Sequence, residues 1–141
     1  MDQATYENLL STYKLLYDSG KIRIEELKKY ISNEIKIECN IQSDDSIEYY
    51  LFGEKLRTQL NCSFSDIRSK KGFVVTYIEI EDENRIKIMD FLRETWFDID
   101  GNVQNSEDYP AGYFLEIFES FRKRFSVRRL NLINQEDYLG Q

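Results

Sequence analysis

The sequence contains no histidine among its 141 residues. Histidine is the usual general base at neutral pH, the usual activator of serine and cysteine nucleophiles, and the commonest ligand of catalytic zinc. Carboxylate, lysine or tyrosine chemistry would have to replace it. We therefore expect a protein that is not an enzyme.

Cysteine, glycine and long apolar runs are scarce as well. Cys39 and Cys62 are the only two cysteines, which excludes a disulfide framework and a four-cysteine zinc site. We expect both thiols to pack as small apolar side chains in a reducing compartment. The six glycines stand singly, so no phosphate-binding glycine loop is present and no cofactor is predicted. No stretch reaches the length of a membrane span and the start lacks a signal-peptide pattern, so we expect a cytoplasmic protein.

The stretch Phe97 to Tyr109 begins F-D-I-D-G-N, which is similar to the start of an EF-hand calcium loop. Counted from Asp98, the first, third and fifth positions carry suitable oxygen ligands. The sixth position is Val103 instead of glycine, and Tyr109 stands where a bidentate glutamate should close the site. The pattern therefore predicts a turn, which Asp, Asn and Gly all favour, and no metal site.

What is present is enough for one domain spanning residues 1–141. Hydrophobic residues make up 41% of the chain, including 10 Tyr, 9 Phe and 1 Trp, which is ample for a single core. We expect a few of these aromatic residues to remain on a surface.

Apolar residues at three- and four-residue spacings predict helices over residues 3–18, 24–32, 47–60, 82–97 and 111–125. Gly20 fits the C-cap of the first helix. Asp82 can cap the fourth, and Pro110 suits the first turn of the last. Gly53 weakens the third prediction by about 1 kcal/mol relative to alanine.

Alternation of apolar and polar residues predicts strands over residues 34–41, 62–67 and 73–81. The last two flank a short turn with a glycine and are predicted to form a hairpin. The order of elements favours an α+β fold, in which a small, mainly antiparallel sheet of about three strands packs against four to five helices.

Three helices followed by a hairpin also resemble a winged helix, a DNA-binding relative of the helix-turn-helix proteins. Such a nucleic-acid-binding regulator would use the basic segment Arg122 to Arg129. Against this alternative, the helix that would enter the groove begins with Asp44, Asp45 and Glu48, which would repel phosphate. These three acids could also bind magnesium, but helix capping explains them equally well.

One thirty-residue stretch, from residue 79 to residue 108, carries the whole net charge of -7. It holds three basic residues and ten acidic ones: Glu79, Glu81, Asp82, Glu83, Asp90, Glu94, Asp98, Asp100, Glu107 and Asp108. One interpretation is a solvated face that keeps the protein soluble. The other is a surface that captures a basic partner, with aromatic anchors such as Tyr109 among the carboxylates.

An opposite block follows, with five bases between Phe121 and Leu130: Arg122, Lys123, Arg124, Arg128 and Arg129. Cations in the last turn of a helix complement its dipole, and we prefer this interpretation to phosphate binding. The pair Glu79 and Glu81 could act as acid and base only if one carboxylate were buried with a raised pKa, and on a strand both are expected to be solvated.

We therefore expect an acidic binding protein that occludes a basic protein partner, most plausibly an immunity or antitoxin-type inhibitor of a nuclease toxin. In general character the chain is similar to bacterial toxin-immunity proteins, which tend to be compact, acidic and free of catalytic motifs. This likeness is one of composition. The predicted partner site comprises the ten acids from Glu79 to Asp108 and Tyr109, and we predict no membrane, nucleic-acid or small-molecule partner.

Overall fold

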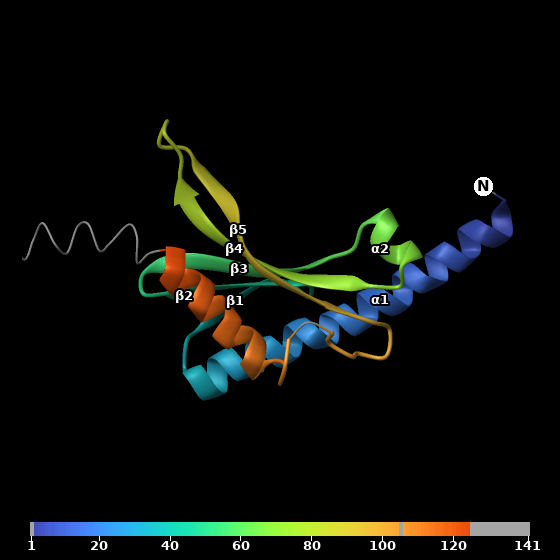
Figure 1. Cartoon of the computed structure of the whole chain (residues 1–141), viewed down its shortest axis with the longest axis horizontal. Helices are drawn as coiled ribbons and strands as arrows, with labels where there is room; N and C mark the ends of the chain where they lie inside the picture. The colour runs from blue at the N-terminus through green and yellow to red at the C-terminus, as the bar shows by residue number, and fades with distance from the viewer. Residues whose placement is uncertain (1, 105, 125–141) are drawn as a thin grey trace, which may run out of the picture.

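The computed structural model describes residues 2–104 and 106–124, and Figure 1 shows their arrangement. The elements are α1 (Gln3–Tyr30), η1 (Ile31–Ile35), β1 (Cys39–Ser43), β2 (Ser46–Leu51), β3 (Glu54–Asn61), α2 (Phe64–Arg68), β4 (Gly72–Glu81) and β5 (Lys87–Phe97). A further helix covers residues 111–124. The strands form one antiparallel sheet in sequence order, each pairing with the next along the chain.

The fold is α+β, but the predicted number of elements is wrong. The sheet has five strands instead of about three, because the predicted helices 47–60 and 82–97 are strands in the structure. Within the described residues the sheet is accompanied by α1, α2 and the helix 111–124, not by four to five helices. Two predictions are confirmed: the strand from residue 73 to 81 and a helix directly after Pro110.

Residues 47–60 form the β2–β3 hairpin instead of a helix. Phe52 and Gly53 have φ angles of 50° and 81°, as a tight two-residue hairpin turn requires. Asn-Gly or Asp-Gly is the usual sequence for such a turn. The Phe-Gly sequence at this position therefore does not indicate a hairpin turn. The buried residues Ile47, Tyr49 and Leu51 alternate along β2, as they should on a strand.

Residues 82–97 likewise form the β4–β5 turn and β5. Asp82 does cap, but it caps a turn: its carboxylate accepts hydrogen bonds from the backbone N–H groups of Asn84 at 2.8 Å and Ile86 at 2.9 Å. Arg85 adopts a φ of 62° in this turn. Pairing with β4 over the length of β5 overrides the local helical spacing.

The two predicted N-terminal helices are one 28-residue helix, α1, which runs through Gly20. A Cβ atom at this glycine would lie 2.3 Å from Cδ1 of Leu60 and 2.9 Å from the ring of Phe97. Gly20 therefore allows α1 to approach the sheet closely and does not end the helix. The helical chain ends only after η1, where Lys36 adopts a left-handed φ of 63°. The strand predicted at 34–41 therefore starts later than expected, at Cys39, the first residue of β1.

The predicted strand at 62–67 is the short helix α2. Ser63 accepts a hydrogen bond from the backbone N–H of Asp66 at 3.3 Å, and the Asp66 carboxylate accepts one from the N–H of Ser63 at 2.8 Å. This reciprocal pair is a capping box, which starts a helix. Cys62, just before it, and Cys39 are partly buried against the core.

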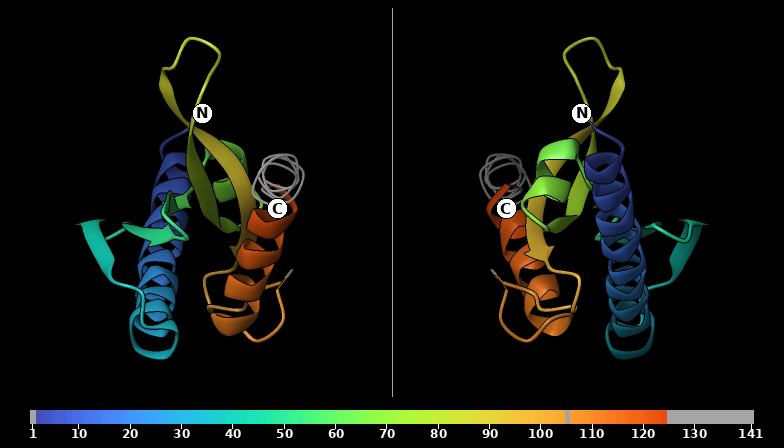
Figure 2. Two further views of the ribbon diagram at one scale, coloured as in Figure 1. Left: turned by 90° about the vertical axis from the view of Figure 1, so that its left-hand side faces the viewer. Right: turned by 90° about the vertical axis from the view of Figure 1, so that its right-hand side faces the viewer.

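The core lies between one face of the sheet and two helices (Figure 2). α1 contributes Leu16, Ile24 and Leu27, and the helix 111–124 contributes Tyr113 and Ile117; each of these side chains is at most 2% exposed. Within the described part of the chain, every helix is too short or too polar to cross a bilayer.

A chain of buried hydroxyl groups crosses this core. Tyr49 of β2 bonds to Thr58 of β3 at 2.8 Å, Thr58 bonds to Thr76 of β4 at 2.8 Å, and Thr76 bonds to Tyr113 of the last helix at 2.9 Å. Burial raises the pKa of both tyrosines. Four hydroxyls in an apolar interior thus satisfy one another across three strands and a helix.

We expect Thr76→Val to lower the free energy of unfolding by about 1 to 3 kcal/mol, because it leaves the Thr58 and Tyr113 hydroxyls without this partner at nearly constant volume. Urea denaturation followed by circular dichroism measures the loss. Thr12→Val, on α1 outside the chain of hydroxyls, is the control and should change stability by less than about 0.5 kcal/mol. Equal stability of the two variants would contradict the role given to Thr76.

Candidate functional site

The β4–β5 hairpin extends beyond the body of the fold, with its tip at the upper left of Figure 1. The register of the pair shifts where Thr76 faces Arg93 and Tyr77 faces Phe91, which leaves Leu92 unmatched. A β-bulge of this kind bends and twists the strands that carry it. Past the bulge the hairpin turns away from the body, and we call its outer part, residues 79–89, the hairpin arm.

Carboxylates gather on the hairpin arm. Glu79 and Glu81 lie two residues apart on β4 and therefore on the same face, and Glu83 is exposed in the turn. Among the described residues, no lysine or arginine nitrogen lies within 4 Å of any of these three carboxylates. Arg85 and Lys87 are also exposed on the hairpin arm, and Lys87 is the cross-strand partner of Glu81. With the acids Glu79, Glu81, Asp82 and Glu83 against these two cations, the hairpin arm keeps a negative net charge.

Exposed isoleucines accompany these carboxylates. Ile80 and Ile88 are cross-strand partners and lie on the face opposite Glu79 and Glu81. Ile86, in the turn, is 58% exposed, and Ile88 is 42% exposed. The hairpin arm therefore presents aliphatic surface bordered by negative charge.

Asp82, Asp90 and Glu94 of the predicted site have different surroundings. Asp82 accepts the hydrogen bonds that shape the turn. Asp90 pairs with the guanidinium of Arg124, which also donates to the backbone carbonyl of Phe91 at 3.1 Å. Glu94 is exposed on β5, nearer the body. Asp90 thus ties the base of the hairpin arm to the end of the helix 111–124.

The remaining predicted acids, Asp98, Asp100, Glu107 and Asp108, lie beyond the other end of β5. A strand of that length spans about 35 Å, so the ten acids do not form one surface. Asp98 makes the predicted turn: its carboxylate accepts the backbone N–H groups of Asp100 at 2.9 Å and Asn102 at 3.0 Å. Desolvation raises the pKa of Asp98, and these hydrogen bonds, with Asn102 foremost, lower it by more.

Tyr109 packs against the core instead of standing among the carboxylates. Its hydroxyl donates to the backbone carbonyl of Arg23, and its ring lies 6.0 Å from that of Tyr113. Burial raises its pKa well above the usual value. In this structure Tyr109 fixes the start of the last helix against α1.

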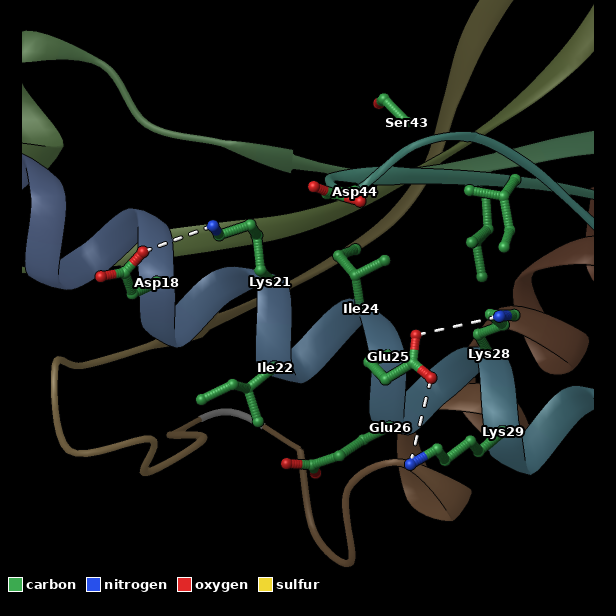
Figure 3. Close-up of a pocket in the computed structure, with 12 residues that line it drawn as sticks. Asp18, Lys21, Ile22, Ile24, Glu25, Glu26, Lys28, Lys29, Ser43 and Asp44 are labelled. Atoms are coloured by element: carbon green, nitrogen blue, oxygen red, sulfur yellow. Dashed lines mark ion pairs between the residues drawn. The ribbon is translucent and has the colours of Figure 1, made fainter.

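A groove of about 550 Å³ runs between α1 and the β1–β2 hairpin (Figure 3). Its apolar lining includes Ile22 and Ile41, which are 53% and 58% exposed. The charged groups on its rim pair along α1, with Lys21 at 3.4 Å from Asp18 and Lys28 at 3.9 Å from Glu25. The groove thus offers apolar surface more than acid–base chemistry.

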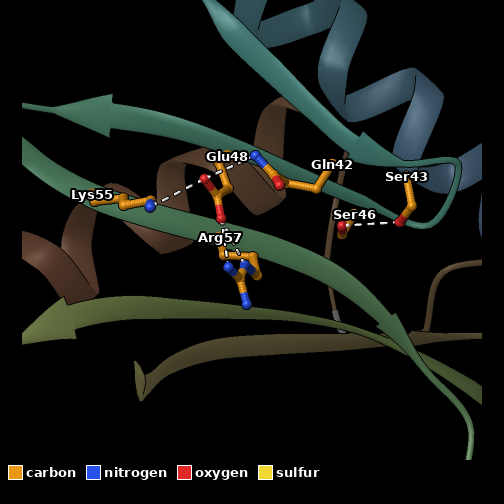
Figure 4. Close-up of polar contacts among 6 residues, drawn as sticks. All are labelled: Gln42, Ser43, Ser46, Glu48, Lys55 and Arg57. Carbon is orange, nitrogen blue, oxygen red and sulfur yellow. Dashed lines mark hydrogen bonds and ion pairs between the residues drawn. The ribbon is translucent and has the colours of Figure 1, made fainter. Parts of the chain in front are cut away.

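Glu48 is the centre of a polar cluster on the sheet (Figure 4). Only 5% of this residue is exposed. Its carboxylate accepts Nε–H of Arg57 at 3.0 Å and the amide of Gln42 at 3.1 Å, and it lies 3.3 Å from Nζ of Lys55. Burial raises the pKa of Glu48, but the hydrogen bonds and charges of Arg57 and Lys55 lower it by more, so its pKa lies below the usual value.

The described residues do not have the element order of a winged helix. Asp44 and Asp45 form the β1–β2 turn and Glu48 lies on β2, so the helix expected to enter a DNA groove is a hairpin. Of the basic segment, Arg122 pairs with Glu119 at 2.9 Å and Arg124 pairs with Asp90. Lys123 is exposed, and the remaining members Arg128 and Arg129, with the aromatic Phe125, lie outside the described residues.

Within residues 2–104 and 106–124, no group of three or more cysteine, aspartate or glutamate side chains is placed to hold a metal ion. Glu79 and Glu81 remain at the surface of the hairpin arm.

The site predicted from the sequence includes the acids of the hairpin arm, but neither the isoleucines beside them nor the cluster around Glu48. Ile86 and Ile88 were assigned to a helix core, although the Ile-Lys-Ile alternation around Lys87 is also typical of a strand. Glu48 was assigned to a helix start. Once the turn at Phe52 and Gly53 is known, its cross-strand position opposite Arg57 follows.

Comparisons of the chain with family models, with curated proteins and with solved structures found no match.

We expect Glu48→Gln to lower the free energy of unfolding by about 1 to 2 kcal/mol at pH 7, because Arg57 and Lys55 lose their shared anion. The pKa of Glu48 is lower in the folded protein than in the unfolded chain, so its stabilising effect is present above the unfolded value, about 4.3. The effect is lost as the pH falls through the folded value. Denaturation of both proteins from pH 7 to pH 3 should show the difference shrinking.

The control for this measurement is Glu38→Gln, which changes an exposed glutamate. It should alter stability little at any pH. A wild-type advantage over Glu48→Gln that stayed constant down to pH 3 would contradict the account of the cluster.

Proposed function

We propose that this protein binds a basic protein partner and occludes its working surface, as an immunity or antitoxin-type inhibitor of a nuclease toxin does. The observation that carries the proposal is the hairpin arm, where carboxylates outnumber cations and border exposed isoleucines on a structure that projects from the body. A protein that holds nucleic acid needs lysines and arginines in its cleft. The carboxylates of the hairpin arm are opposite in charge to such a cleft.

The two kinds of side chain would have different roles in the complex. Glu79, Glu81 and Glu83 would pair with the cations that otherwise hold phosphate, and their field would speed the encounter. Ile86 and Ile88 would lose their exposed apolar surface in the cleft, which supplies affinity that does not depend on charge. Inhibition would be steric and electrostatic, with no catalytic step.

The anchoring of the hairpin arm supports this role. At its base, Asp90 pairs with Arg124, and the Arg124 guanidinium also holds the Phe91 carbonyl. Deeper in the body, Thr76 of β4 belongs to the buried chain of hydroxyls. A binding element that is already ordered loses less conformational entropy when it binds, so more of the contact energy appears as affinity.

The proposal is tested by affinity capture of the tagged protein from cells that carry its native locus, in washes of rising salt, with protein and nucleic acid both quantified. We expect one basic protein in near-equal amount. Glu81→Lys/Glu83→Lys should weaken its binding by about 100-fold, because like charges then face each other across the interface. Wild-type affinity should also fall with salt, since exposed charges are screened.

Asp100→Lys/Glu107→Lys is the matched control, because it makes the same change in net charge at the far end of β5. It should leave affinity within a few-fold of the wild type. Equal losses in the two double variants would mean that net charge, and not the hairpin arm, governs binding. Recovery of nucleic acid without a protein partner would overturn the proposal.

A further inference from the structure

An apolar stripe runs the full length of α1 and continues beyond the sheet that covers it. Apolar residues or glycine recur at alternating spacings of four and three: Tyr6, Leu10, Tyr13, Tyr17, Gly20, Ile24, Leu27 and Ile31. These are the a and d positions of a heptad repeat, the pattern by which one helix packs against another. The residues from Gly20 onward are buried against the core.

The first half of the stripe is exposed. Tyr6 is 57% exposed, and Leu10 and Tyr13 are each 38% exposed. Figure 1 shows this half of α1 extending past the end of the sheet toward the N-terminus. The short helix α2 lies beside it, along Thr5 and Thr12, on a different side of the helix from the stripe. Within the described residues, the stripe from Tyr6 to Tyr13 therefore lacks the cover that its other end has. Tyr17, next along the stripe, is half-buried, and its hydroxyl donates to the Asp45 carboxylate in the β1–β2 turn at 3.3 Å.

The charged residues beside the exposed part of the stripe indicate which helix packs against it. Glu7 and Lys14 are exposed and seven residues apart, so both occupy the e position of the heptad. When two copies of such a helix pack antiparallel about a two-fold axis, the e positions of one face the e positions of the other. Glu7 of each copy then lies opposite Lys14 of the other, and two identical ion pairs form.

We propose that two copies of this chain associate through the exposed halves of α1, packed antiparallel. Leu10 of one copy contacts Tyr13 of the other at the centre, Tyr6 reaches toward the second Tyr17, and the Glu7–Lys14 pairs flank the seam. A parallel arrangement would instead bring Lys14 beside Leu9 and leave Glu7 without a cation. The surface is separate from the hairpin arm, so either proposal can fail without the other.

The test is the molar mass of the whole chain in solution over a wide range of protein concentration, measured by sedimentation equilibrium. We expect a reversible monomer–dimer equilibrium. Leu10→Glu should abolish it, because a charge would be buried at the centre of the seam. Leu15→Glu is the matched control: Leu15 is 52% exposed but lies on the opposite side of α1, and the dimer should persist.

Charge exchange tests the antiparallel arrangement itself. Glu7→Lys and Lys14→Glu should each weaken the dimer about tenfold, because each places like charges opposite one another, while the double exchange should restore wild-type association. The proposal is overturned by a monomer at every concentration, by a dimer that Leu10→Glu leaves intact, by equal losses from Leu10→Glu and Leu15→Glu, or by a double exchange that restores nothing.

Discussion

The buried hydroxyls of Tyr49, Thr58, Thr76 and Tyr113 are the constraint on which the rest of the structure depends. Each is closed to solvent, so each must find a partner within the protein. The partners are one another, in a line from β2 to the last helix. A slip of one residue in either strand pair would turn a threonine to the other face and break the line. The hydroxyls therefore specify both the register of the central strands and the position of the helix 111–124 on the sheet.

Two elements reach beyond this body, and each is the continuation of an element that is buried elsewhere. β4 contributes the buried residues Val74 and Ile78 to the core, Ile80 is partly buried against it, and the strand then continues into the tip of the hairpin arm. The buried residues of α1 all lie from Leu16 onward, while its first half is largely exposed. The body of the fold thus holds in place the hairpin arm and the first half of α1, which make few contacts with the core themselves. In the functional account, one surface meets a basic partner and the other meets a second copy of the chain.

The sequence was sufficient where local chemistry and tertiary structure agree. β4 is rich in β-branched residues, the last helix follows Pro110 directly, and Asp98 forms the predicted turn. The sequence was misleading where contacts between residues far apart in the chain determine the local structure. Gly20 looked like a helix end because its contact with Leu60 and Phe97 cannot be seen in the sequence. The acids from Glu79 to Asp108 were grouped because they follow one another in the sequence, whereas the extended β5 separates the acids of the hairpin arm from those beyond its other end.

The central claim is that the hairpin arm is the part of the molecule that enters the partner. Amide hydrogen exchange of the free protein and of its complex with the captured partner tests it most directly. The account predicts that the amides of residues 82–88 exchange markedly more slowly in the complex than in the free protein. Protection confined to residues 98–108, with the hairpin arm exchanging as fast as before, would contradict it.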